Sequence, residues 1–491
     1  GAGIDLDAAK PAFAVRRASK VGATYIAWSP DSESISWSVG AEFKTANINT
    51  LMNGDYATPA TGNNLSMQVA HAIPNTAVAL TNARVITMND ERAVIENATV
   101  LIKGNRIESI ARGTAVPEDY TEIDLAGKTI MPGIIDAHAH GPYAGDDIIP
   151  QQNWNLLAHL ALGVTTVHNP SSSAKSAFAA AEYARTDRIL GPRIFSTGEI
   201  VYGAKSTSWA PIDNLDDAFA HVRRLAAQGA ISVKNYNQPR REQRQQVIEA
   251  ARQEGLISVA EGGSLYQLDM SMIADGITGI EHNVPTLKMY DDVHQFWRQS
   301  GAGYTPTLVV TYGGLTSEDY FYQNTEVWKH PILSNFVPPS QLQARSVRRV
   351  TAPEEDYRDD DSAAAAKILM DAGIMVNIGA HGQREGLASH WEMWSFARGG
   401  FSPMEALATA TINPARHLGM DKDIGSLEAG KLADLVIVDA NPLDDIRNTD
   451  RISHVMINGR LYRAGDLSEE VTGTATLSPF HWQTTPQGAI R

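Results

Sequence analysis

Two histidines, His138 and His140, stand two positions apart in the stretch PGIIDAHAHG, residues 132–141. Side chains two positions apart on a β-strand point to the same face of a sheet, so both imidazoles are expected on one side. Neutral imidazole is the commonest side-chain ligand of zinc-like metals. The pair therefore predicts a divalent-metal site, and the alternative is two histidines on a half-buried strand without a metal.

The composition limits what else can hold a metal. The chain of 491 residues contains no cysteine, which excludes disulfides, thiolate ligands and cysteine nucleophiles. Its net charge of −15 argues against nucleic acid as a partner, because such binding depends on basic patches. No apolar run approaches the ~20 residues that cross a bilayer, so we expect no membrane span. Histidine, carboxylate and a modified lysine remain as ligands, and no dinucleotide fingerprint is present.

The elements that must position these ligands alternate between strand-like and helical patterns after residue 131. With the strand that leads into His138, they make eight β/α units, which predicts a (β/α)8 barrel over residues 131–423. Helical patterns such as NLDDAFAHVRRLAAQG and REQRQQVIEAARQEG end near a glycine. The further candidate strands are Thr165–His168, Arg193–Thr197, Ile231–Asn235, Ile257–Glu261, Gly279–His282, Thr307–Val310 and Met375–Gly379. In such a barrel the active-site residues stand at the carboxyl ends of the strands.

Three other segments flank this barrel. Residues 77–130 and 424–465 alternate apolar and polar residues and are expected to meet as one small β-sandwich. Residues 1–76 contain short β-like runs, including AWSPDSESISWSVG, and resemble one blade of a β-propeller. Residues 466–491 are a C-terminal tail. The stretch 311–361 is too long for a simple loop, so we interpret it as a lid or a substrate-specificity insert.

The motifs taken together resemble the amidohydrolase superfamily, in particular its imidazolonepropionase-like and prolidase-like branch. The resemblance covers roughly residues 77–465. It depends on GKTIMPGIIDAHAHG, ALGVTTVHNP, GPRIFSTG, GITGIEHN, SPMEALATATINPARHLG and GSLEAGKLADLVIVDANPL. The blade-like start resembles a subgroup in which a TolB-type β-propeller is fused to an amidohydrolase.

The resemblance implies a set of metal ligands beyond the first pair. Lys234, in ISVKNY, stands where many members carry a carboxylated lysine that bridges two metals. A lysine desolvated in a barrel has a lowered pKa, and its neutral amine can take up carbon dioxide; the alternative is a lysine paired with a carboxylate. His282, in GIEHN, matches the family's histidine on strand 6, and a satisfied core histidine is the alternative.

Two positions depart from the family pattern. Strand 5 usually ends in histidine, but LISVAEGG places Glu261 there, and strand 8 usually ends in aspartate, but VNIGAHGQ places His381 there. The two changes are complementary, since a carboxylate and an imidazole exchange places. The exchange keeps the ligand inventory, which favours a working two-metal site over a mononuclear site or an inactive relative.

The resemblance also implies a mechanism. A metal-activated hydroxide attacks a carbonyl carbon, and the strand-8 residue passes the proton to the leaving nitrogen. Here His381 or Glu261 would do that work, with His381 preferred as the positional equivalent. His168 ends strand 2 and would line the pocket or bind the oxyanion, with packing as the alternative. Tyr312 would donate to the oxyanion. His390 is expected on the helix after strand 8 as a packing or assembly residue, and His417 lies in a helical pattern and is expected to be structural.

The predicted function is metal-dependent hydrolysis of a C–N amide bond in a small peptide, an N-acyl amino acid or a cyclic amide. One or two divalent ions are expected, with zinc first and manganese, iron or cobalt as alternatives, together with a carbamate on Lys234. The competing hypotheses are an ester or lactone hydrolase with the same site and a non-catalytic barrel scaffold. The residues do not separate amides from esters, because a metal activates water alike for both.

The incomplete propeller bears on partners and location. One blade cannot bury both of its faces, so we expect a second chain that carries the remaining blades, for instance after cleavage of one precursor. Amidohydrolases often self-assemble, which makes a homo-oligomer a further expectation. Fusions of this kind usually look exported, and this favours a periplasmic or secreted location over a cytoplasmic one.

Overall fold

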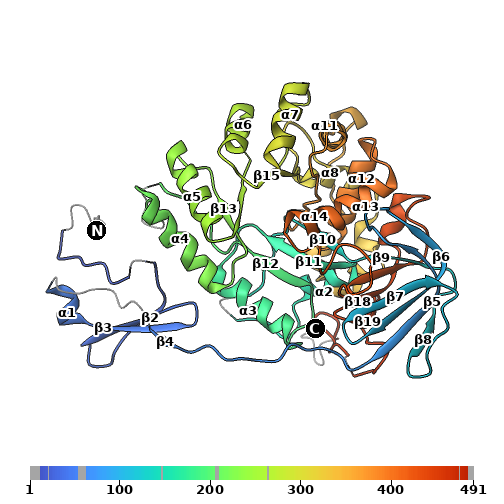
Figure 1. The fold of residues 1–491 in the computed structure, drawn as a ribbon, viewed down its shortest axis with the longest axis horizontal. Helices are drawn as coiled ribbons and strands as arrows, with labels where there is room; N and C mark the ends of the chain where they lie inside the picture. Colours follow the sequence, from blue (N-terminus) through green and yellow to red (C-terminus); the bar gives the residue numbers. More distant parts are fainter. Residues whose placement is uncertain are drawn as a thin grey trace, which may run out of the picture.

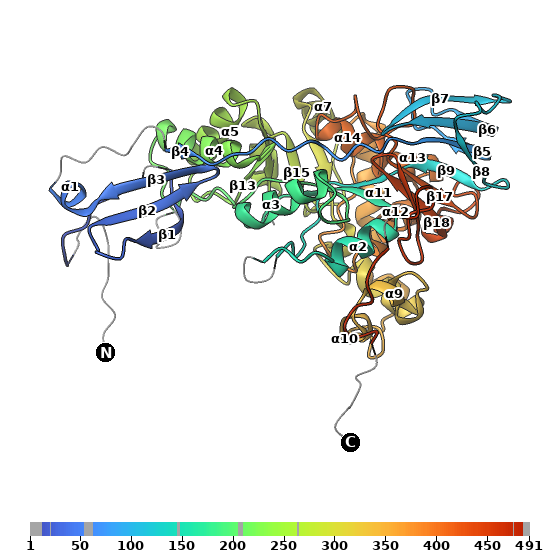
Figure 2. The same cartoon turned by 90° about the horizontal axis from the view of Figure 1, so that it is seen from below.

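The computed structural model describes residues 12–19, 21–53, 62–144, 148–204, 210–262, 265–474 and 476–484. Three regions follow one another along the long axis of the molecule (Figure 1). An N-terminal sheet lies at one end, a parallel α/β region lies in the middle, and a second sheet lies at the other end (Figures 1 and 2). The segment between the N-terminal sheet and β5 runs along the middle region and connects the two ends (Figure 2).

The N-terminal sheet is antiparallel, in the order β1-β2-β3-β4. Its elements are β1 (Thr24–Trp28), β2 (Ser34–Val39), β3 (Glu42–Asn47), the short helix α1 (Ile48–Met52) and β4 (Asn63–Asn64). The turn before β2 is held by the Ser29 hydroxyl, which donates to Asp31. The sheet contacts the middle region where Lys175 Nζ lies 5.5 Å from the Tyr25 ring centroid. One four-stranded sheet of this kind is described, and a propeller built from several remains a proposal.

The middle region has parallel strands in two groups. The first group is β10 (Ile134–Asp136), β11 (Val164–Asn169) and β12 (Arg193–Ser196); the second is β13 (Ser232–Asn235), β14 (Ile257–Ala260), β15 (Gly279–Glu281) and β16 (Gly303–Thr305). Single parallel bridges from Val201 to Asn235 and from Tyr304 to Val376 extend the pairing. The chain after Val376 returns to β10, where His381 N–H donates to His138 O at 2.6 Å. The carboxyl ends of these strands therefore surround one space.

The predicted strands can be compared with the observed ones. Five of them are confirmed as β11 to β15, shifted by at most one residue at either end. The predicted strand Thr307–Val310 is wrong: β16 covers Gly303–Thr305, and Leu308–Val310 forms the 3-10 turn η1. Pro306 has no N–H for the ladder, and Thr307 has a φ of 49°, which bends the chain out of the strand. The predicted strand Met375–Gly379 is not a regular strand: it forms a parallel bridge at Val376, and Ile378 O accepts from Ala137 N–H at 3.3 Å.

Helices follow the strands and cover their outer side (Figure 1). The two helical patterns singled out in the sequence are confirmed as α4 (Leu215–Gln228) and α5 (Arg241–Gln253). Asn214 caps α4 by accepting from Asp217 N–H, and Gly229 ends it with a φ of 113°. The others are α2 (Trp154–Ala161), α3 (Ala174–Arg185), α6 (Tyr266–Ala274), α7 (Asp291–Ser300), α11 (Asp359–Asp371), α12 (Leu387–Arg398), α13 (Pro403–Thr409) and α14 (Ile412–His417).

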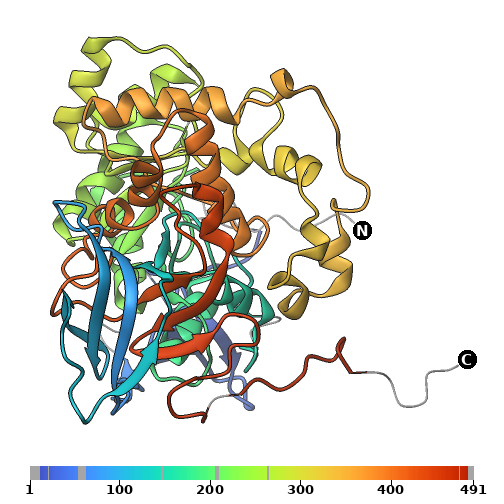
Figure 3. The ribbon, with the colours of Figure 1, turned by 90° about the vertical axis from the view of Figure 1, so that its right-hand side faces the viewer.

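The stretch that we interpreted as an insert folds into short helices that project from the side of the middle region (Figure 3, yellow to orange). They are α8 (Ser317–Asn324), η2 (Val327–Lys329), α9 (Leu333–Phe336), α10 (Pro339–Gln343) and η3 (Glu354–Asp356). Phe321 and Trp391 of α12 stack with ring centroids 5.4 Å apart, which anchors the insert on the helix after the last bridge.

The second sheet has eight strands drawn from both sides of the middle region. Its strands are β5 (Ala77–Ile86), β6 (Val94–Lys103), β7 (Arg106–Arg112), β8 (Thr121–Asp124), β9 (Thr129–Pro132), β17 (Leu435–Val438), β18 (Ile452–Ile457) and β19 (Arg460–Arg463), with η4 (Ile446–Asp450) between β17 and β18. We expected a sandwich; the strands instead belong to one hydrogen-bonded sheet in the order β19-β18-β17-β9-β5-β6-β7, with β8 beside β5. Leu80 of β5, Leu435 of β17 and Leu461 of β19 share one apolar cluster. None of the helices in the described ranges is long and apolar enough to cross a membrane.

Candidate metal centre

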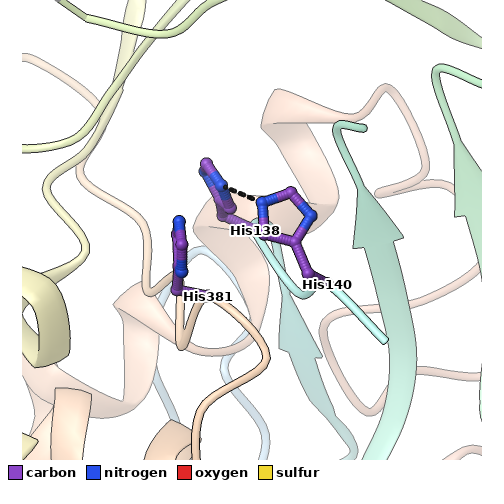
Figure 4. A group of neighbouring side chains, drawn as sticks. All are labelled: His138, His140 and His381. Atoms are coloured by element: carbon purple, nitrogen blue, oxygen red, sulfur yellow. Dashed lines mark hydrogen bonds between the residues drawn. The ribbon is translucent and has the colours of Figure 1, made fainter. Parts of the chain in front are cut away.

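Three histidines converge where the end of β10 meets the segment after Val376. One potential ligand atom from each of His138, His140 and His381 lies within 4.8 Å of the others. Figure 4 shows the three rings facing one space, with a hydrogen bond between the first two. The His282 ring joins them, with its centroid 5.0 Å from those of His138 and His381. Four imidazoles therefore gather at the carboxyl ends of three chain segments.

His138 is fixed from below by two carboxyl groups. Its Nδ1 lies 2.7 Å from Glu281 Oε2, and both side chains are at most 1 % exposed. Its backbone N–H donates to Asp136 Oδ1 at 3.1 Å. A carboxyl oxygen that accepts from Nδ1–H sets the tautomer, so the lone pair of Nε2 faces the space between the rings.

His140 is oriented by an amide. Its Nδ1 lies 3.0 Å from Asn169 Oδ1 at the end of β11, and the Asn169 amide donates to the Tyr143 hydroxyl at 3.2 Å. With the amide nitrogen donating to Tyr143, the amide oxygen is left to accept from Nδ1–H. His140 Nε2 lies 3.2 Å from His138 Nε2; a proton on one of the two nitrogens makes the hydrogen bond between them, and a bound cation would instead take the lone pairs of both.

His381 reaches the cluster through a strained turn. Its φ is 58°, which side chains other than glycine rarely adopt. The next residue, Gly382, has a φ of 76°, and a Cβ there would stand 2.1 Å from His140 O. Only glycine permits this close approach. The strain is concentrated where the chain presents an imidazole to the cluster, which is typical of functional sites.

The other side of the site is an ion pair. Lys234 Nζ, on β13, lies 2.6 Å from Glu261 Oε2 after β14, and Glu261 Oε1 lies 3.4 Å from His282 Nε2. Lys234 is 1 % exposed and the Glu261 side chain 22 %. On the far side of its ring, His282 Nδ1 meets Thr307 Oγ1 at 2.6 Å. Within the described chain His282 Nε2 has no hydrogen-bond partner.

Electrostatics favour the neutral form of three imidazoles, because burial lowers the pKa values of His138, His140 and His381. Desolvation, followed by the charge of Lys234, holds the pKa of His138 well below its usual value. Desolvation, followed by His140, lowers the pKa of His381 to about 3. Burial by itself would raise the pKa of Glu261, but His282 and Lys234 outweigh it and lower that pKa to about 2. At neutral pH the site therefore offers imidazole lone pairs and an ionised carboxylate.

A layer of buried acids lies beneath the histidines. Desolvation raises the pKa of Glu281 to about 8 and that of Glu392 well above its usual value. Asp136 accepts from the Ser389 hydroxyl at 2.8 Å, and Glu392 accepts from Val309 N–H at 2.7 Å. These acids join β10, the η1 turn and α12 under the site, and burying them is costly unless they are bonded in this way.

Two predicted catalytic residues lie in different surroundings. Both ring nitrogens of His168 are engaged, Nδ1 with Ala137 O at 2.9 Å and Nε2 with the Ser232 hydroxyl at 2.8 Å. His168 thus links β11 to β10 and β13. Tyr312 is 40 % exposed, and its ring centroid lies 5.6 Å from that of His282. The oxyanion roles of both residues stay predictions.

Four residues that contact the histidines were not predicted from the sequence: Asp136, Asn169, Glu281 and Thr307. Asp136 carried a signal, because a carboxylate two positions before His138 belongs to the same strand face. Glu281 carried the opposite signal, since strand alternation would separate it from its neighbour His282. The φ of 69° at His282 breaks that alternation and lets both side chains reach the site.

The site residues fit a divalent metal. Their donor set is imidazole nitrogen and carboxylate oxygen, which suits zinc and related ions. Among the described residues, the buried Nε2 of His282 has only a long contact of 3.4 Å, to Glu261 Oε1, and a metal between these two atoms would satisfy both.

Comparisons with known proteins agree with this chemistry. The model of the Amidohydrolase family matches residues 129–462. A 5-methylthioadenosine/S-adenosylhomocysteine deaminase from Bacillus cereus (strain 03BB102) is 23 % identical over 423 residues, which cover 77 % of this chain and 92 % of the relative. A solved Xaa-Pro dipeptidase with bound methionine superposes with a TM-score of 0.60 at 22 % identity, over 79 % of this chain and 100 % of that one. Phenylurea hydrolase B gives a TM-score of 0.59 at 20 % identity, over 79 % and 96 %. At these identities the two structures support the fold.

Proposed function

The chain belongs to the amidohydrolase family, and we propose that it hydrolyses the amide C–N bond of a small peptide, an N-acyl amino acid or a cyclic amide. Membership of this family establishes that the chain is an enzyme and that its reaction class is the metal-dependent hydrolysis of C–N bonds. The observation that supports the proposal most is the gathering of neutral imidazoles beside an ionised carboxylate at the carboxyl ends of the parallel strands. The Xaa-Pro dipeptidase among the similar structures favours an amide next to an amino acid.

We assign the first metal to His138, His140 and His381, with zinc as the first candidate and manganese, iron or cobalt as alternatives. A bound divalent ion lowers the pKa of water and polarises a carbonyl oxygen. The chain's own residues orient the ligands for this chemistry: Glu281 and Asn169 contact the Nδ1 atoms of His138 and His140 and so fix the orientation of both rings. Holding ligands in place before the metal arrives avoids the cost of ordering them upon binding.

The proton transfer falls to Glu261 rather than to His381, which the sequence analysis had preferred. A histidine that binds a metal has no free lone pair to accept a proton, and His381 belongs to the ligand group. Glu261 lies outside that group, is ionised, and has Oε1 directed at His282. As long as Lys234 carries no carbamate, its Nζ lies 2.6 Å from the other oxygen of Glu261.

A second metal is the finer part of the proposal. Its ligands would be His282 and an anionic group at Lys234, whose amine becomes a carbamate by taking up carbon dioxide. The position of Lys234 at the end of β13, beside Glu261 and His282, supports this assignment, and formation of the carbamate would replace the ion pair that Lys234 makes with Glu261 at 2.6 Å. We therefore expect a second equivalent of zinc to bind only when bicarbonate is present.

The remaining proposals concern architecture and assembly. We propose that the parallel strands and the segment at Val376 form a (β/α)8 barrel, as in the family. We also propose that the N-terminal sheet is one blade of a TolB-type propeller completed by a second chain, that the enzyme is oligomeric, and that it acts in the periplasm or outside the cell. Large exposed side chains on β1 support a second chain that covers this sheet: Tyr25, Ile26 and Trp28 are 64 %, 62 % and 61 % exposed.

An activity panel tests the function. Purified enzyme loaded with zinc or manganese is assayed on dipeptides, N-acyl amino acids, cyclic amides, matched esters and an adenosine derivative for ammonia release. We expect turnover of at least one amide, abolished by chelation and restored by metal. Turnover of esters alone would move the function to ester hydrolysis, and no turnover of any substrate would favour the scaffold.

A further inference from the structure

A cavity of about 470 Å³ lies beside the metal centre, on the side of His282. Its walls come from the residues after His282, from the start of the insert and from the start of α11, and they include Asn283, Val284, Pro285, Leu287, Tyr312 and Arg358. Tyr312 belongs to both places, because its ring packs 5.6 Å from His282 and also lines the cavity. Asn283 Oδ1 accepts from Tyr312 N–H at 2.7 Å and fixes the two walls together.

The lining combines apolar walls with one kind of charge. Val284, Pro285 and Leu287 supply aliphatic surface, and Leu287 is 49 % exposed. Arg358 is the one charged residue among the described residues that line the cavity, and none of these carries a carboxylate. A chamber of this kind fits an apolar group that carries a negative charge, because the apolar walls suit the group and the only charge that the described lining offers a ligand is the positive charge of Arg358.

The backbone of Arg358 is held in place, and its guanidinium can still bind a ligand. Its backbone N–H donates to Leu315 O at 3.0 Å, and the missing side chain of Gly314 leaves room for its stem, since a Cβ there would collide with Arg358 Cγ. Its side chain pairs with Asp361 at 2.9 Å, but the two are 46 % and 45 % exposed. An exposed pair of this sort contributes little, and the guanidinium has five N–H donors.

We propose that this cavity binds the part of the substrate beyond the scissile bond, and that Arg358 binds a free carboxylate there. The apolar walls take the side chain next to that carboxylate, and the planar guanidinium binds it with two parallel hydrogen bonds. The inference rests on the proposed function and narrows its substrate class to N-acyl or peptidyl derivatives of apolar amino acids with a free carboxylate. Cyclic amides without a carboxylate and peptides with a blocked end are poor substrates.

Matched substrates and variants test the proposal. N-acetyl-L-phenylalanine and its carboxamide, and L-alanyl-L-leucine and its carboxamide, are assayed with the metal-loaded wild type, Arg358→Gln and Arg348→Ala. Release of acetate or alanine is measured for both members of each pair. Arg348 is the control, because it is an exposed arginine of the same insert that does not line the cavity. Binding of both N-acetyl compounds is measured in parallel by calorimetry.

We expect Arg358→Gln to raise KM for the free acids about ten- to a hundredfold with kcat nearly unchanged, and to leave the carboxamides unaffected. The variant's melting temperature should match that of the wild type. Equal KM values for acid and carboxamide in the wild type, or an equal loss in Arg348→Ala, would overturn the assignment of Arg358 while leaving the hydrolytic function intact. If no amide is hydrolysed, the proposed function fails, and the calorimetric preference for the acid, lost in Arg358→Gln, still decides the binding site.

Discussion

The metal centre and the N-terminal sheet distribute polar and apolar side chains in opposite ways. In the metal centre, Lys234, His138 and Glu281 are at most 1 % exposed, although burying ionisable groups is costly. On β1, Tyr25 and Trp28 are 64 % and 61 % exposed, although burying them would be favourable. The first region therefore buries ionisable groups at a cost in folding stability, and the proposed catalytic function explains why they are buried. The second region leaves large apolar side chains exposed, which is the observation behind our proposal that another chain covers this sheet.

The largest expected effect comes from removing a ligand. His138→Ala removes the imidazole that Glu281 orients, and we expect kcat/KM to fall by about a thousandfold or more, on the order of 4 kcal/mol of transition-state stabilisation. Steady-state kinetics on the best amide of the panel measures it. His481→Ala, at an exposed position near the end of the described chain, serves as the control and should retain full activity.

The next effect separates the two halves of the site. Glu261→Gln should lower kcat by about a hundred- to ten-thousandfold, the usual range for a lost general base, while the first metal stays bound. His381→Asn should lose that metal. Metal content and kcat are measured on both variants. The opposite pattern, with metal lost from Glu261→Gln and kept in His381→Asn, would reverse the two roles.

A smaller effect tests the buried acid beneath the histidines. Glu281→Ala leaves Nδ1 of His138 without its acceptor, and we expect metal affinity to weaken about ten- to a hundredfold, as for other residues that orient a ligand. Glu281→Gln keeps an acceptor and should lose less. Competition with a chromogenic chelator reports the affinity, and unchanged affinity in both variants would mean that Glu281 only fills space.

A pH effect on stability comes from His390, which is fully buried on α12. Desolvation lowers the pKa of His390 to about 4 from its ordinary 6.5. Between these two pKa values the unfolded chain binds a proton at His390 and the folded chain does not. The contribution of His390 to the free energy of unfolding is therefore complete above pH 6.5 and is lost as the pH falls toward 4. The loss amounts to about 3 kcal/mol in the free energy of unfolding.

Urea unfolding between about pH 4 and pH 7 measures this contribution. In His390→Gln, the free energy of unfolding should fall by about 3 kcal/mol less between pH 7 and pH 4 than in the wild type. Desolvation also lowers the pKa of His168 to about 4, and this second contribution remains in the variant. An unchanged slope in His390→Gln would contradict the prediction.

The smallest effect belongs to the N-terminal sheet. Trp28→Ser should change the free energy of unfolding by less than about 0.5 kcal/mol, because an exposed side chain loses few contacts. Trp37, on β2 of the same sheet, is 2 % exposed, and Trp37→Ser should cost about 3 kcal/mol or more. A large loss in Trp28→Ser in the isolated chain would show that β1 already has a covering layer.

Many of the residues gathered at the candidate site were predictable from the sequence because they follow local rules. His138 and His140 obey strand alternation, and Lys234, Glu261 and His282 each stand within one residue of the end of a strand. The end of β16 was not predictable, because the turn at Pro306 and Thr307 interrupts an apolar run that looks like a strand. The contact between Glu281 and His138 depends on a left-handed backbone at His282, which no local pattern announces.

The pairing of Lys234 with Glu261 and the cavity at Arg358 depend on contacts between segments far apart in the sequence. The insert is an example of such long-range contacts. Its helix α8 packs on α12 through Phe321 and Trp391, and Arg358, near the end of the insert, lines the cavity. Apolar periodicity indicates that helices form, but it does not say which partner they will meet.

The metal content of the purified protein tests the central claim most directly. Inductively coupled plasma mass spectrometry on dialysed enzyme, with the His138→Ala and His140→Ala double variant as control, counts divalent ions per chain. We predict at least one ion per wild-type chain and a loss of that ion in the double variant, with circular dichroism unchanged. Substantially less than one ion after loading with zinc, or equal content in the variant, would contradict a metal centre built on these histidines.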